Sequence, residues 1–256
     1  MKRVLTALAL IPLIVYVVLW SPQWVVLGVT AMVALLCYSE YSSIAAAYGV
    51  GNLGPLGFGA GLLLLAAPEN AGLMLTVAAA LFGLGIALRA GDLRTGVVRA
   101  AFLALGVVYV FGCWRYAPLL GSVNRYWLFY ALVLNWVGDI GAYYIGRNFG
   151  KHKLAPVVSP GKSWEGAVAS LASSLVFGFF FLRWAVPQVS APAVLGLTAA
   201  ANIAGQFGDL CESALKRGAG VKDSGSILPG HGGMLDRVDS TLFTLPVVYL
   251  CVGGKW

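Results

Sequence analysis

Long apolar stretches recur along most of this sequence, and they restrict its fold more than any other feature. A helix needs roughly 20 mainly apolar residues to cross a lipid bilayer, and stretches of about this length follow one another here. Only 11% of the residues are charged, compared with about 25% in soluble globular proteins. The sequence therefore predicts an all-α fold, a polytopic transmembrane helical bundle of about eight to nine spans.

The candidate spans are separated by short polar segments. They cover residues 4–20, 23–38, 53–67, 71–88, 97–113, 126–146, 165–186, 190–208 and 241–253. The third span is short and rich in glycine, so a re-entrant segment is an alternative for it. The spacing of Gly57 and Gly61 in this span fits close packing against another helix.

The basic residues indicate how such a bundle would be oriented. If the N-terminus is cytoplasmic, thirteen of the 17 Lys and Arg residues fall in cytoplasmic segments, as the positive-inside rule requires. These residues are Lys2, Arg3, Arg89, Arg94, Arg99, Arg147, Lys151, Lys153, Lys162, Lys216, Arg217, Lys222 and Arg237. Binding of an anionic substrate could account for part of the same bias.

The acidic residues divide the chain into two regions. Seven of the ten Asp and Glu residues lie between Asp139 and Asp239, whereas the first half holds only Glu40, Glu69 and Asp92. We therefore expect residues 1–125 to be an N-terminal transmembrane scaffold. Residues 126–256 would form the C-terminal transmembrane catalytic region of the same integral membrane unit.

Two polar features precede the densest part of this region. Asp139 lies inside a candidate span, and a carboxylate at membrane depth normally faces a cavity or a partner. The Gly161-Lys162-Ser163 sequence resembles a phosphate-binding P-loop, but Pro156 replaces the required glycine and no strand precedes it. The backbone at Gly161 and the charge of Lys162 could still bind phosphate; an ordinary basic loop is equally compatible.

The densest polar stretch predicts two helical faces joined by a glycine-rich loop. If residues 206–217 are helical, Asp209, Ser213 and Lys216 lie on one face, and Glu212 could pair with Lys216 instead. The loop ends in Gly232-Gly233, where small residues allow close approach to a ligand. A helix beginning near Leu235 would point its positive end at that ligand and carry Asp236 and Asp239 on one face.

These residue types suit phosphoryl-type chemistry, which mostly requires positioning and neutralisation of charge. Carboxylates such as Asp209, Asp236 and Asp239 are ligands for Mg²⁺, and two such ions could hold the entering and leaving oxygens. The basic residues that could neutralise a polyphosphate are Lys216, Arg217, Lys222 and Arg237. The alternative is a solvated charged loop between spans.

The same stretch resembles the signature of phosphatidate cytidylyltransferases, also called CDP-diacylglycerol synthases. The matching pattern is Ser213-x2-Lys216-Arg217-x4-Lys222-Asp223-x-Gly225-x2-Leu228-Pro229-x-His231-Gly232-Gly233-Met234-x-Asp236-Arg237-x-Asp239. Asp139, the Ser159–Gly166 loop and the residues around Asp209 resemble the family too. The specific resemblance covers about residues 135–240, and the first half matches only as a run of spans.

The resemblance implies a transferase that condenses CTP with phosphatidic acid, giving CDP-diacylglycerol and pyrophosphate, with Mg²⁺ as cofactor in a site of one or two metal ions. It implies catalytic residues Asp209, Lys222, Asp236 and Asp239, and metal ligands Asp139, Asp209, Asp236 and Asp239. It implies substrate contacts from Lys162, Ser213, Lys216, Arg217, Lys222, His231, Gly232, Gly233 and Arg237. A homodimer in a bacterial cytoplasmic (inner) membrane is expected, with the N-terminus and the active site facing the cytoplasm and no nucleic-acid partner.

Two other functions remain open on the residues alone. A CTP-dependent transferase acting on another lipid phosphate would use the same groups. An ion-coupled transporter could use Asp139 and Asp209 as intramembrane relays, but it would have no use for the glycine-rich loop or the clustered Lys and Arg residues.

Overall fold

The computed structural model describes residues 2–88, 92–227 and 232–253. The chain is mostly helical and forms two compact units, each built from separate segments of the sequence. Unit 1 comprises Met1–Leu10, Pro22–Pro118 and Leu215–Arg237, and unit 2 comprises Ile11–Ser21, Leu119–Ala214 and Val238–Trp256. These units differ from the predicted division into residues 1–125 and 126–256. That division is functional and stays a prediction.

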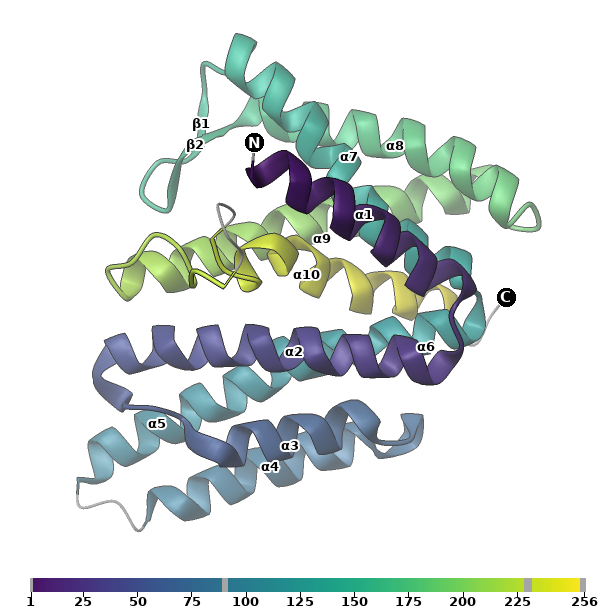
Figure 1. Ribbon diagram of the computed structural model, residues 1–256. Coiled ribbons are helices and arrows are strands. Elements are labelled where there is room, and N and C mark those ends of the chain that lie inside the picture. The colour runs from purple at the N-terminus through teal and green to yellow at the C-terminus, as the bar shows by residue number, and fades with distance from the viewer. Residues whose placement is uncertain (1, 89–91, 228–231, 254–256) are drawn as a thin grey trace. The chain divides into compact units, whose positions relative to one another are not determined.

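Unit 1 is built on four helices that run alongside one another (Figure 1). They are α2 (Gln23–Ala45), α3 (Gly54–Ala66), α4 (Gly72–Ala87) and α5 (Leu93–Gly106). Short π-helical turns at Ala46–Val50 and Val107–Gly112 extend α2 and α5. Asp92 caps α5 by accepting hydrogen bonds from the N–H groups of Arg94 and Thr95.

The core of unit 1 depends on small residues in α3. Tyr38 of α2 and Phe111 are fully buried, with ring centroids 5.3 Å apart. A Cβ atom added at Gly57 would overlap the Tyr38 ring, and one added at Gly61 would lie 2.0 Å from Phe111 Cδ2. The prediction that these two glycines allow close helix packing is therefore confirmed.

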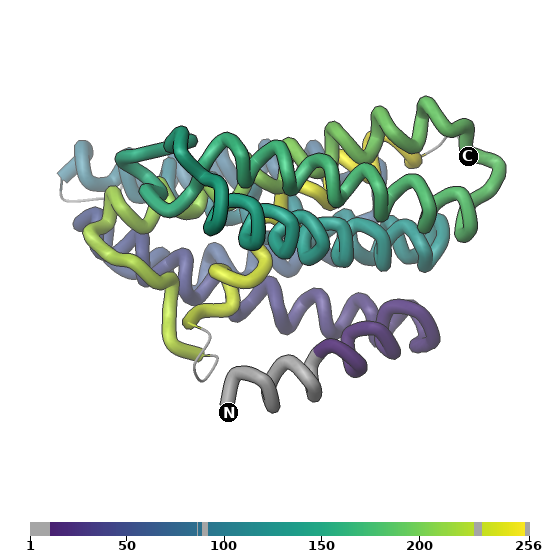
Figure 2. Tube along the Cα trace, turned by 90° about the horizontal axis from the view of Figure 1, so that it is seen from above, coloured from purple at the N-terminus to yellow at the C-terminus, as the bar shows by residue number. Residues whose placement is uncertain are grey.

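Unit 2 contains the pair α7 (Arg125–Phe149) and α8 (Trp164–Ala185), most of α9 (Ala191–Gly218) and most of α10 (Leu235–Val252). Figure 2 shows α7 and α8 lying side by side. Their close approach depends on glycine, because a Cβ atom at Gly141 would lie 2.4 Å from Ser173 Oγ. Asn124 and Ser163 cap α7 and α8 through their side chains.

A β-hairpin joins α7 to α8 and is an addition to the predicted all-α fold. Strands β1 (Lys153–Ala155) and β2 (Ser159–Ser163) pair antiparallel, with Lys153 opposite Ser163 and Ala155 opposite Ser159. The sequence predicts a loop here, because two strands this short give little periodic signal. The hairpin fixes the position of Gly161 and Lys162 on β2.

The remaining helices are α1 (Lys2–Trp20) and the short α6 (Tyr116–Val123), and a 3-10 turn at Glu69–Ala71 precedes α4. The predicted spans agree with the helices to within a few residues in most cases. The main difference is at α9, which continues to Gly218, about ten residues beyond the predicted end of its span at 208. The polar residues from Asp209 to Arg217 are therefore helical.

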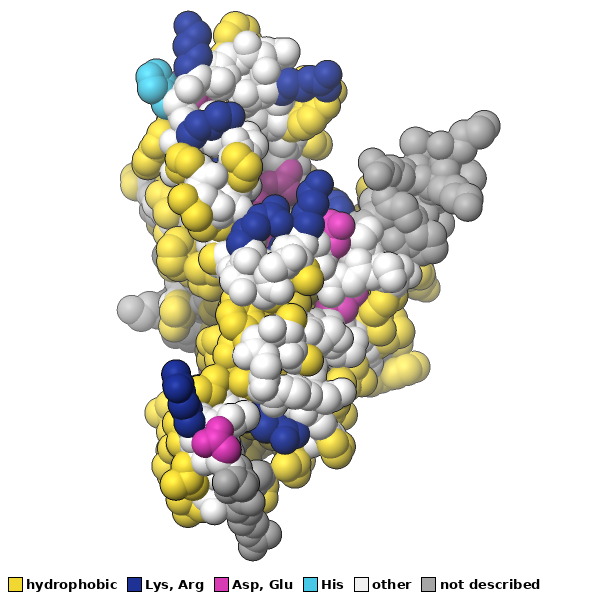
Figure 3. Space-filling model, turned by 90° about the vertical axis from the view of Figure 1, so that its left-hand side faces the viewer, with side chains coloured by type: hydrophobic (Ala, Val, Ile, Leu, Met, Phe, Trp, Pro, Cys, Tyr) yellow, Lys and Arg dark blue, Asp and Glu magenta, His cyan; other side chains and the backbone are white. Residues whose placement is uncertain are grey.

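Within the described residues, four helices are long and apolar enough to cross a membrane: Gln23–Val50, Leu93–Val123, Arg125–Phe149 and Trp164–Ala185. Ile11–Trp20, Gly54–Ala66 and Glu69–Gly85 are apolar but shorter. Large apolar side chains such as Trp24, Leu73 and Leu250 are exposed. Apolar side chains cover much of the face in Figure 3, with the Lys and Arg side chains in a few groups. This surface is that of a membrane protein.

The glycines of α3 give a matched test of this packing. We expect Gly61→Ala to destabilise the protein by about 1–3 kcal/mol, because its Cβ atom would overlap the Phe111 ring. Gly59→Ala is the control, since a Cβ atom there has no neighbour within 4 Å and the helix gains stability. Thermal unfolding in detergent measures both, and equal midpoints for the two variants would contradict the packing described.

Candidate active site

Unit 2 contains a cavity of about 580 Å³ between α7, α8 and α9. Each helix contributes residues three or four positions apart, as expected for one helical face. The helical lining residues include Asn135, Asp139, Ala142, Tyr143, Gly146 and Arg147 from α7, Gly166, Ala167 and Ser170 from α8, and Asn202, Gly205, Gln206 and Asp209 from α9. Lys162 of β2 and Ser240 of α10 complete the polar part of the wall.

The cavity brings together a basic and an acidic residue, Lys162 and Asp209, that are distant in sequence. Lys162 Nζ lies 2.6 Å from Asp209 Oδ2, and both side chains are partly exposed. Asp139 lies on the same wall, so the expectation that this carboxylate faces a cavity is confirmed. Ser213 follows Asp209 by one helical turn and donates a hydrogen bond of 3.4 Å to Asp209 Oδ1.

A third carboxylate lies near this pair. Burial above all, and then the negative charges of Asp209 and Asp139, raise the pKa of Asp239 to about 7. The backbone N–H of Ser240 and the charge of Lys162 act in the opposite direction. The like charges of Asp139, Asp209 and Asp239 repel one another, and a cation placed among them would relieve that repulsion.

The inner wall of the cavity is a network of amide and hydroxyl groups, none of which is among the site residues predicted from the sequence. Asn202 Nδ2 donates to Ser170 Oγ and Ser174 Oγ, and Gln206 Nε2 donates to Asn202 Oδ1 at 2.7 Å. Asn135 accepts a hydrogen bond from Thr244 Oγ1. The signal that could have revealed these residues is their helical spacing from Asp139 and Asp209, because residues that share a face with a functional carboxylate line the same cavity.

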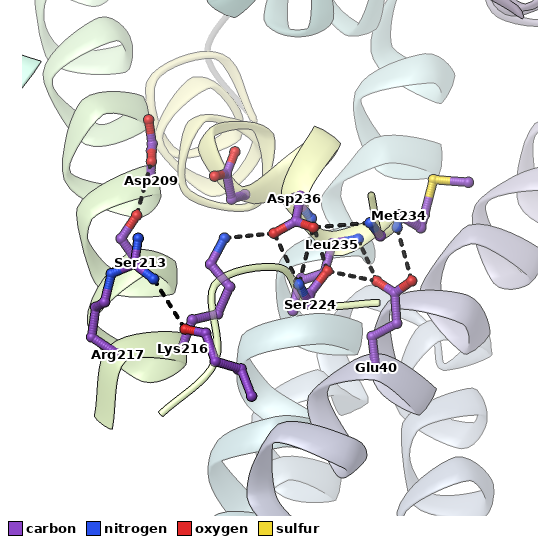
Figure 4. A network of polar contacts seen from close by, with 12 residues as sticks. Glu40, Asp209, Ser213, Lys216, Arg217, Ser224, Met234, Leu235 and Asp236 are labelled. Carbon is purple, nitrogen blue, oxygen red and sulfur yellow. Dashed lines mark hydrogen bonds and ion pairs between the residues drawn. The ribbon is translucent and has the colours of Figure 1, made fainter. Parts of the chain in front are cut away.

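Unit 1 holds a second polar cluster, centred on Asp236 in the first turn of α10 (Figure 4). Lys216 Nζ lies 2.5 Å from Asp236 Oδ1, and the two side chains are only 10% and 8% exposed. Asp236 also accepts hydrogen bonds from the N–H groups of Ser224 and Gly233. Asp236 is therefore a buried, fully hydrogen-bonded carboxylate.

These donors determine how Asp236 titrates. Burial acts to raise the pKa of Asp236, but the hydrogen bonds from Lys216, Gly233 and Ser224 outweigh it and hold the pKa below the ordinary value of 3.8. Because the pKa is depressed by folding, the ionised form stabilises the fold at pH values above 3.8. This contribution is lost as the pH falls through the folded pKa.

The glycine-rich loop is closely packed against the protein's own side chains. Gly232 has φ +81°, a conformation that favours glycine, and a Cβ atom there would lie 3.0 Å from Asp236 Oδ2. Gly233 lies against Ser224 and against Glu40 of α2. The predicted close approach at these glycines is thus to Asp236, Ser224 and Glu40.

The other predicted substrate-binding residues of unit 1 are at the surface. Arg217, Lys222 and Arg237 are exposed. The Arg217 guanidinium donates to the carbonyl of Val221. His231 lies outside the described residues, so its role stays a prediction.

The predicted site residues therefore fall into two groups. Unit 2 holds Asp139, Lys162, Asp209, Ser213 and Asp239, and unit 1 holds Lys216, Arg217, Lys222, Gly232, Gly233, Asp236 and Arg237. Helices α9 and α10 each carry residues of both groups. The predicted helix beginning near Leu235 is confirmed, as is the helical face shared by Asp209 and Ser213.

The described acidic residues do not form a closed metal site. In the part of the chain that the structure describes, no three Asp, Glu, His or Cys side chains are grouped closely enough to hold a metal ion. Asp209 is paired with Lys162, and Asp236 with Lys216. Asp139, Asp209 and Asp239 carry oxygen donors of the kind that Mg²⁺ prefers.

Comparison with known proteins agrees with this chemistry. Residues 1–253 match the model of the cytidylyltransferase family. The chain belongs to the cytidylyltransferase family. The match includes both units, and therefore also the N-terminal half, where the sequence offered only a run of spans.

Several curated bacterial proteins are similar to this chain. A Bacillus subtilis protein named phosphatidate cytidylyltransferase is 42% identical over 151 residues, covering 58% of this chain and 56% of the relative. Proteins of the same name are 42% identical in Staphylococcus aureus strain COL and 43% identical in Staphylococcus haemolyticus. Each of these two alignments covers 155 residues, 60% of this chain and 60% of the relative. The matched part is thus less than two thirds of these relatives.

The Lys216–Asp236 pair predicts a pH-dependent loss of stability. We expect Lys216→Met to cost about 3 kcal/mol near neutral pH, because it leaves the buried Asp236 carboxylate without its cation. The cost should shrink as the pH falls from 3.8 through the lower folded pKa of Asp236, because protonation then removes the charge of Asp236. Chemical denaturation in detergent at several pH values measures the difference.

The exposed Lys222 is the matched control for this measurement. Lys222→Met removes the same charge from the same unit at an exposed position and should change stability by less than about 0.5 kcal/mol. Equal losses for the two variants at neutral pH would contradict the buried ion pair.

Proposed function

We propose that this protein is a phosphatidate cytidylyltransferase, which condenses CTP with phosphatidic acid to give CDP-diacylglycerol and pyrophosphate. The observation that carries the proposal is the polar cavity of unit 2, where Asp139, Lys162 and Asp209 meet. Membership of the cytidylyltransferase family and the names of the similar bacterial proteins support it. A cavity of about 580 Å³ is within the range of small-molecule sites, roughly 300–1,000 Å³.

The reaction requires little acid–base chemistry from the protein. A phosphate oxygen of phosphatidic acid forms a bond to the α-phosphorus of CTP, and the bond from that phosphorus to the β-phosphate oxygen breaks. The attacking oxygen is already ionised near neutral pH, so the barrier comes mainly from bringing two anions together. Fixed positive charges lower such a barrier.

The basic residues have distinct surroundings that suit this task. Lys162 lines the cavity beside Asp209 and would contact a phosphate that enters it. Lys216 is held against Asp236, whereas Arg217, Lys222 and Arg237 are exposed to solvent. We propose that residues of both groups act in the reaction, with Ser213, Gly232, Gly233 and His231 as further substrate contacts.

We propose that Mg²⁺ assists the reaction and that Asp139, Asp209 and Asp239 hold it, with Asp236 as a further predicted ligand. When bound, Mg²⁺ supplies neutralisation of the phosphate charge. Asp209 would hold the ion beside Lys162, which lies against its Oδ2 atom, and Lys162 would contact the nucleotide phosphates.

We propose that the protein is a homodimer with about eight to nine spans in the bacterial cytoplasmic membrane. Its N-terminus and active site would face the cytoplasm, where CTP is found. The distribution of Lys and Arg residues in the sequence supports this orientation. Access from the bilayer would let the acyl chains of phosphatidic acid remain in lipid during the reaction.

The deciding experiment is an assay of the purified protein in detergent with CTP, phosphatidic acid and Mg²⁺. We expect CDP-diacylglycerol and pyrophosphate in equal amounts. No product under conditions in which the Bacillus subtilis relative is active would refute the proposal. Product from another lipid phosphate at a higher rate would favour a different CTP-dependent lipid transferase.

The cavity predicts a specific role for Lys162. Lys162→Ala should lower kcat/KM for CTP by about 100-fold, because it removes the cation that faces the cavity. Lys153→Ala is the control, since Lys153 lies on the paired strand β1 and outside the cavity lining. Steady-state kinetics at varied CTP measures both, and similar losses in the two variants would argue against a contact from Lys162.

Removal of the metal ion gives a separate prediction. EDTA should abolish activity, and added Mg²⁺ should restore it. Asp209→Asn should raise the Mg²⁺ concentration that gives half-maximal activity by at least tenfold, because it removes one anionic oxygen donor from the proposed set. An unchanged Mg²⁺ requirement would exclude Asp209 from the ligands.

A further inference from the structure

Glu40 of α2 has surroundings that its position in the sequence does not suggest. It lies within the apolar Gln23–Val50 segment, which is long enough to cross a membrane, and it is only 4% exposed. Its carboxylate contacts the start of α10 and the loop before it, almost two hundred residues away along the chain. All of these residues belong to unit 1.

Both oxygens of Glu40 accept hydrogen bonds from this segment (Figure 4). The N–H of Met234 donates to Oε1 at 2.9 Å, and the N–H of Leu235 donates to Oε2 at 2.8 Å. Ser224 Oγ donates to Oε2 at 3.0 Å. Two of the donors are backbone groups at the N-terminus of α10, where the helix dipole also favours a negative charge.

These contacts explain two glycines of the motif. A Cβ atom at Gly225 would lie 2.6 Å from Glu40 Oε1, and a Cβ atom at Gly233 would lie 2.6 Å from Glu40 Oε2. A larger residue at either position would displace the carboxylate. The glycines therefore leave room for a side chain of the N-terminal half of the chain, which carries no motif of its own.

Ser224 connects Glu40 to the buried ion pair. Its hydroxyl contacts Glu40, while its N–H donates to both oxygens of Asp236 at 3.2 and 3.0 Å. Asp236 in turn holds Lys216. A continuous set of hydrogen bonds thus runs from Glu40 through Ser224 to the charged residues of the motif.

We infer that Glu40 is a positioning residue of the transferase, which fixes Ser224, Met234 and Leu235 and thereby holds Asp236 and Lys216 in the orientation that catalysis requires. The inference rests on the proposed function for its catalytic consequence. The hydrogen bonds by which Glu40 positions Ser224 and the start of α10 do not depend on the proposed function. Glu40 itself does not touch the substrate in this role.

The test compares Glu40→Gln with Glu69→Gln, which makes the same change at an exposed position of unit 1 outside this network. Two quantities are measured on folded protein isolated by size exclusion: the hydrogen exchange rate of residues 223–236, and kcat and KM in the CTP assay. Glutamine has one acceptor oxygen, and its amide group would face another donor. We therefore expect the segment to exchange at least tenfold faster and kcat to fall at least tenfold, with KM for CTP changed less than threefold.

Two further variants separate positioning from a general loss of folding. Glu40→Asp keeps the charge and should recover part of the lost kcat. Ser224→Ala removes one hydrogen bond to Glu40 and should lower kcat by about three- to tenfold, with little further loss when combined with Glu40→Gln. If Glu40→Gln does not fold, Ser224→Ala decides the outcome through the same two measurements.

The outcomes distinguish this inference from the proposed function. A kcat for Glu40→Gln within twofold of the wild type would overturn the inference while the proposed function stands. If the wild type makes no CDP-diacylglycerol, the proposed function is refuted, and so is the catalytic effect inferred for Glu40. Unchanged hydrogen exchange in Glu40→Gln would overturn the positioning itself, whichever reaction the protein catalyses.

Discussion

The cost of burying charge in an apolar helical protein governs the structure. A buried ionised group is tolerated only when hydrogen bonds or an opposite charge replace its water. Arg115 illustrates this in unit 1, where it is only 6% exposed and donates to the carbonyls of Leu64, Ala67 and Pro68 at the end of α3. Glu40 does the same at the start of α10, with the opposite charge. Each group satisfies helix-end atoms that would otherwise lack partners.

The same constraint distinguishes the two groups of site residues. In unit 1, the Asp236 carboxylate is surrounded by donors and its pKa is lowered. In unit 2, Asp239 lies near two other carboxylates and its pKa is raised. In the first arrangement the carboxylate is stabilised by its own donors and by Lys216. In the second, the positive charge of Lys162 beside Asp209 offsets part of the repulsion among the carboxylates.

The sequence predicted the fold well where a periodic signal was strong. The apolar stretches gave most helices to within a few residues, and the helix at Leu235 followed from the glycine loop before it. The β-hairpin was missed because its strands are short. Asp139 and Asp209 were identified by their charge, whereas Asn202, Gln206 and Ser170 were missed. Polar uncharged residues are common on helices, and only the packing of α7, α8 and α9 shows which of them line a cavity.

Composition and motif by themselves determined that the chain is a helical membrane protein with a concentrated set of acids, bases and glycines suited to nucleotide and phosphate chemistry. Both properties are local, since they depend on hydropathy and on residue spacing along one segment. The tertiary structure decided which charges meet. Lys162 pairs with Asp209 and Lys216 with Asp236, and Glu40 binds the loop before α10 from almost two hundred residues away. No local pattern encodes such pairs, because a buried charge can be satisfied by any donor that the fold brings within hydrogen-bond distance.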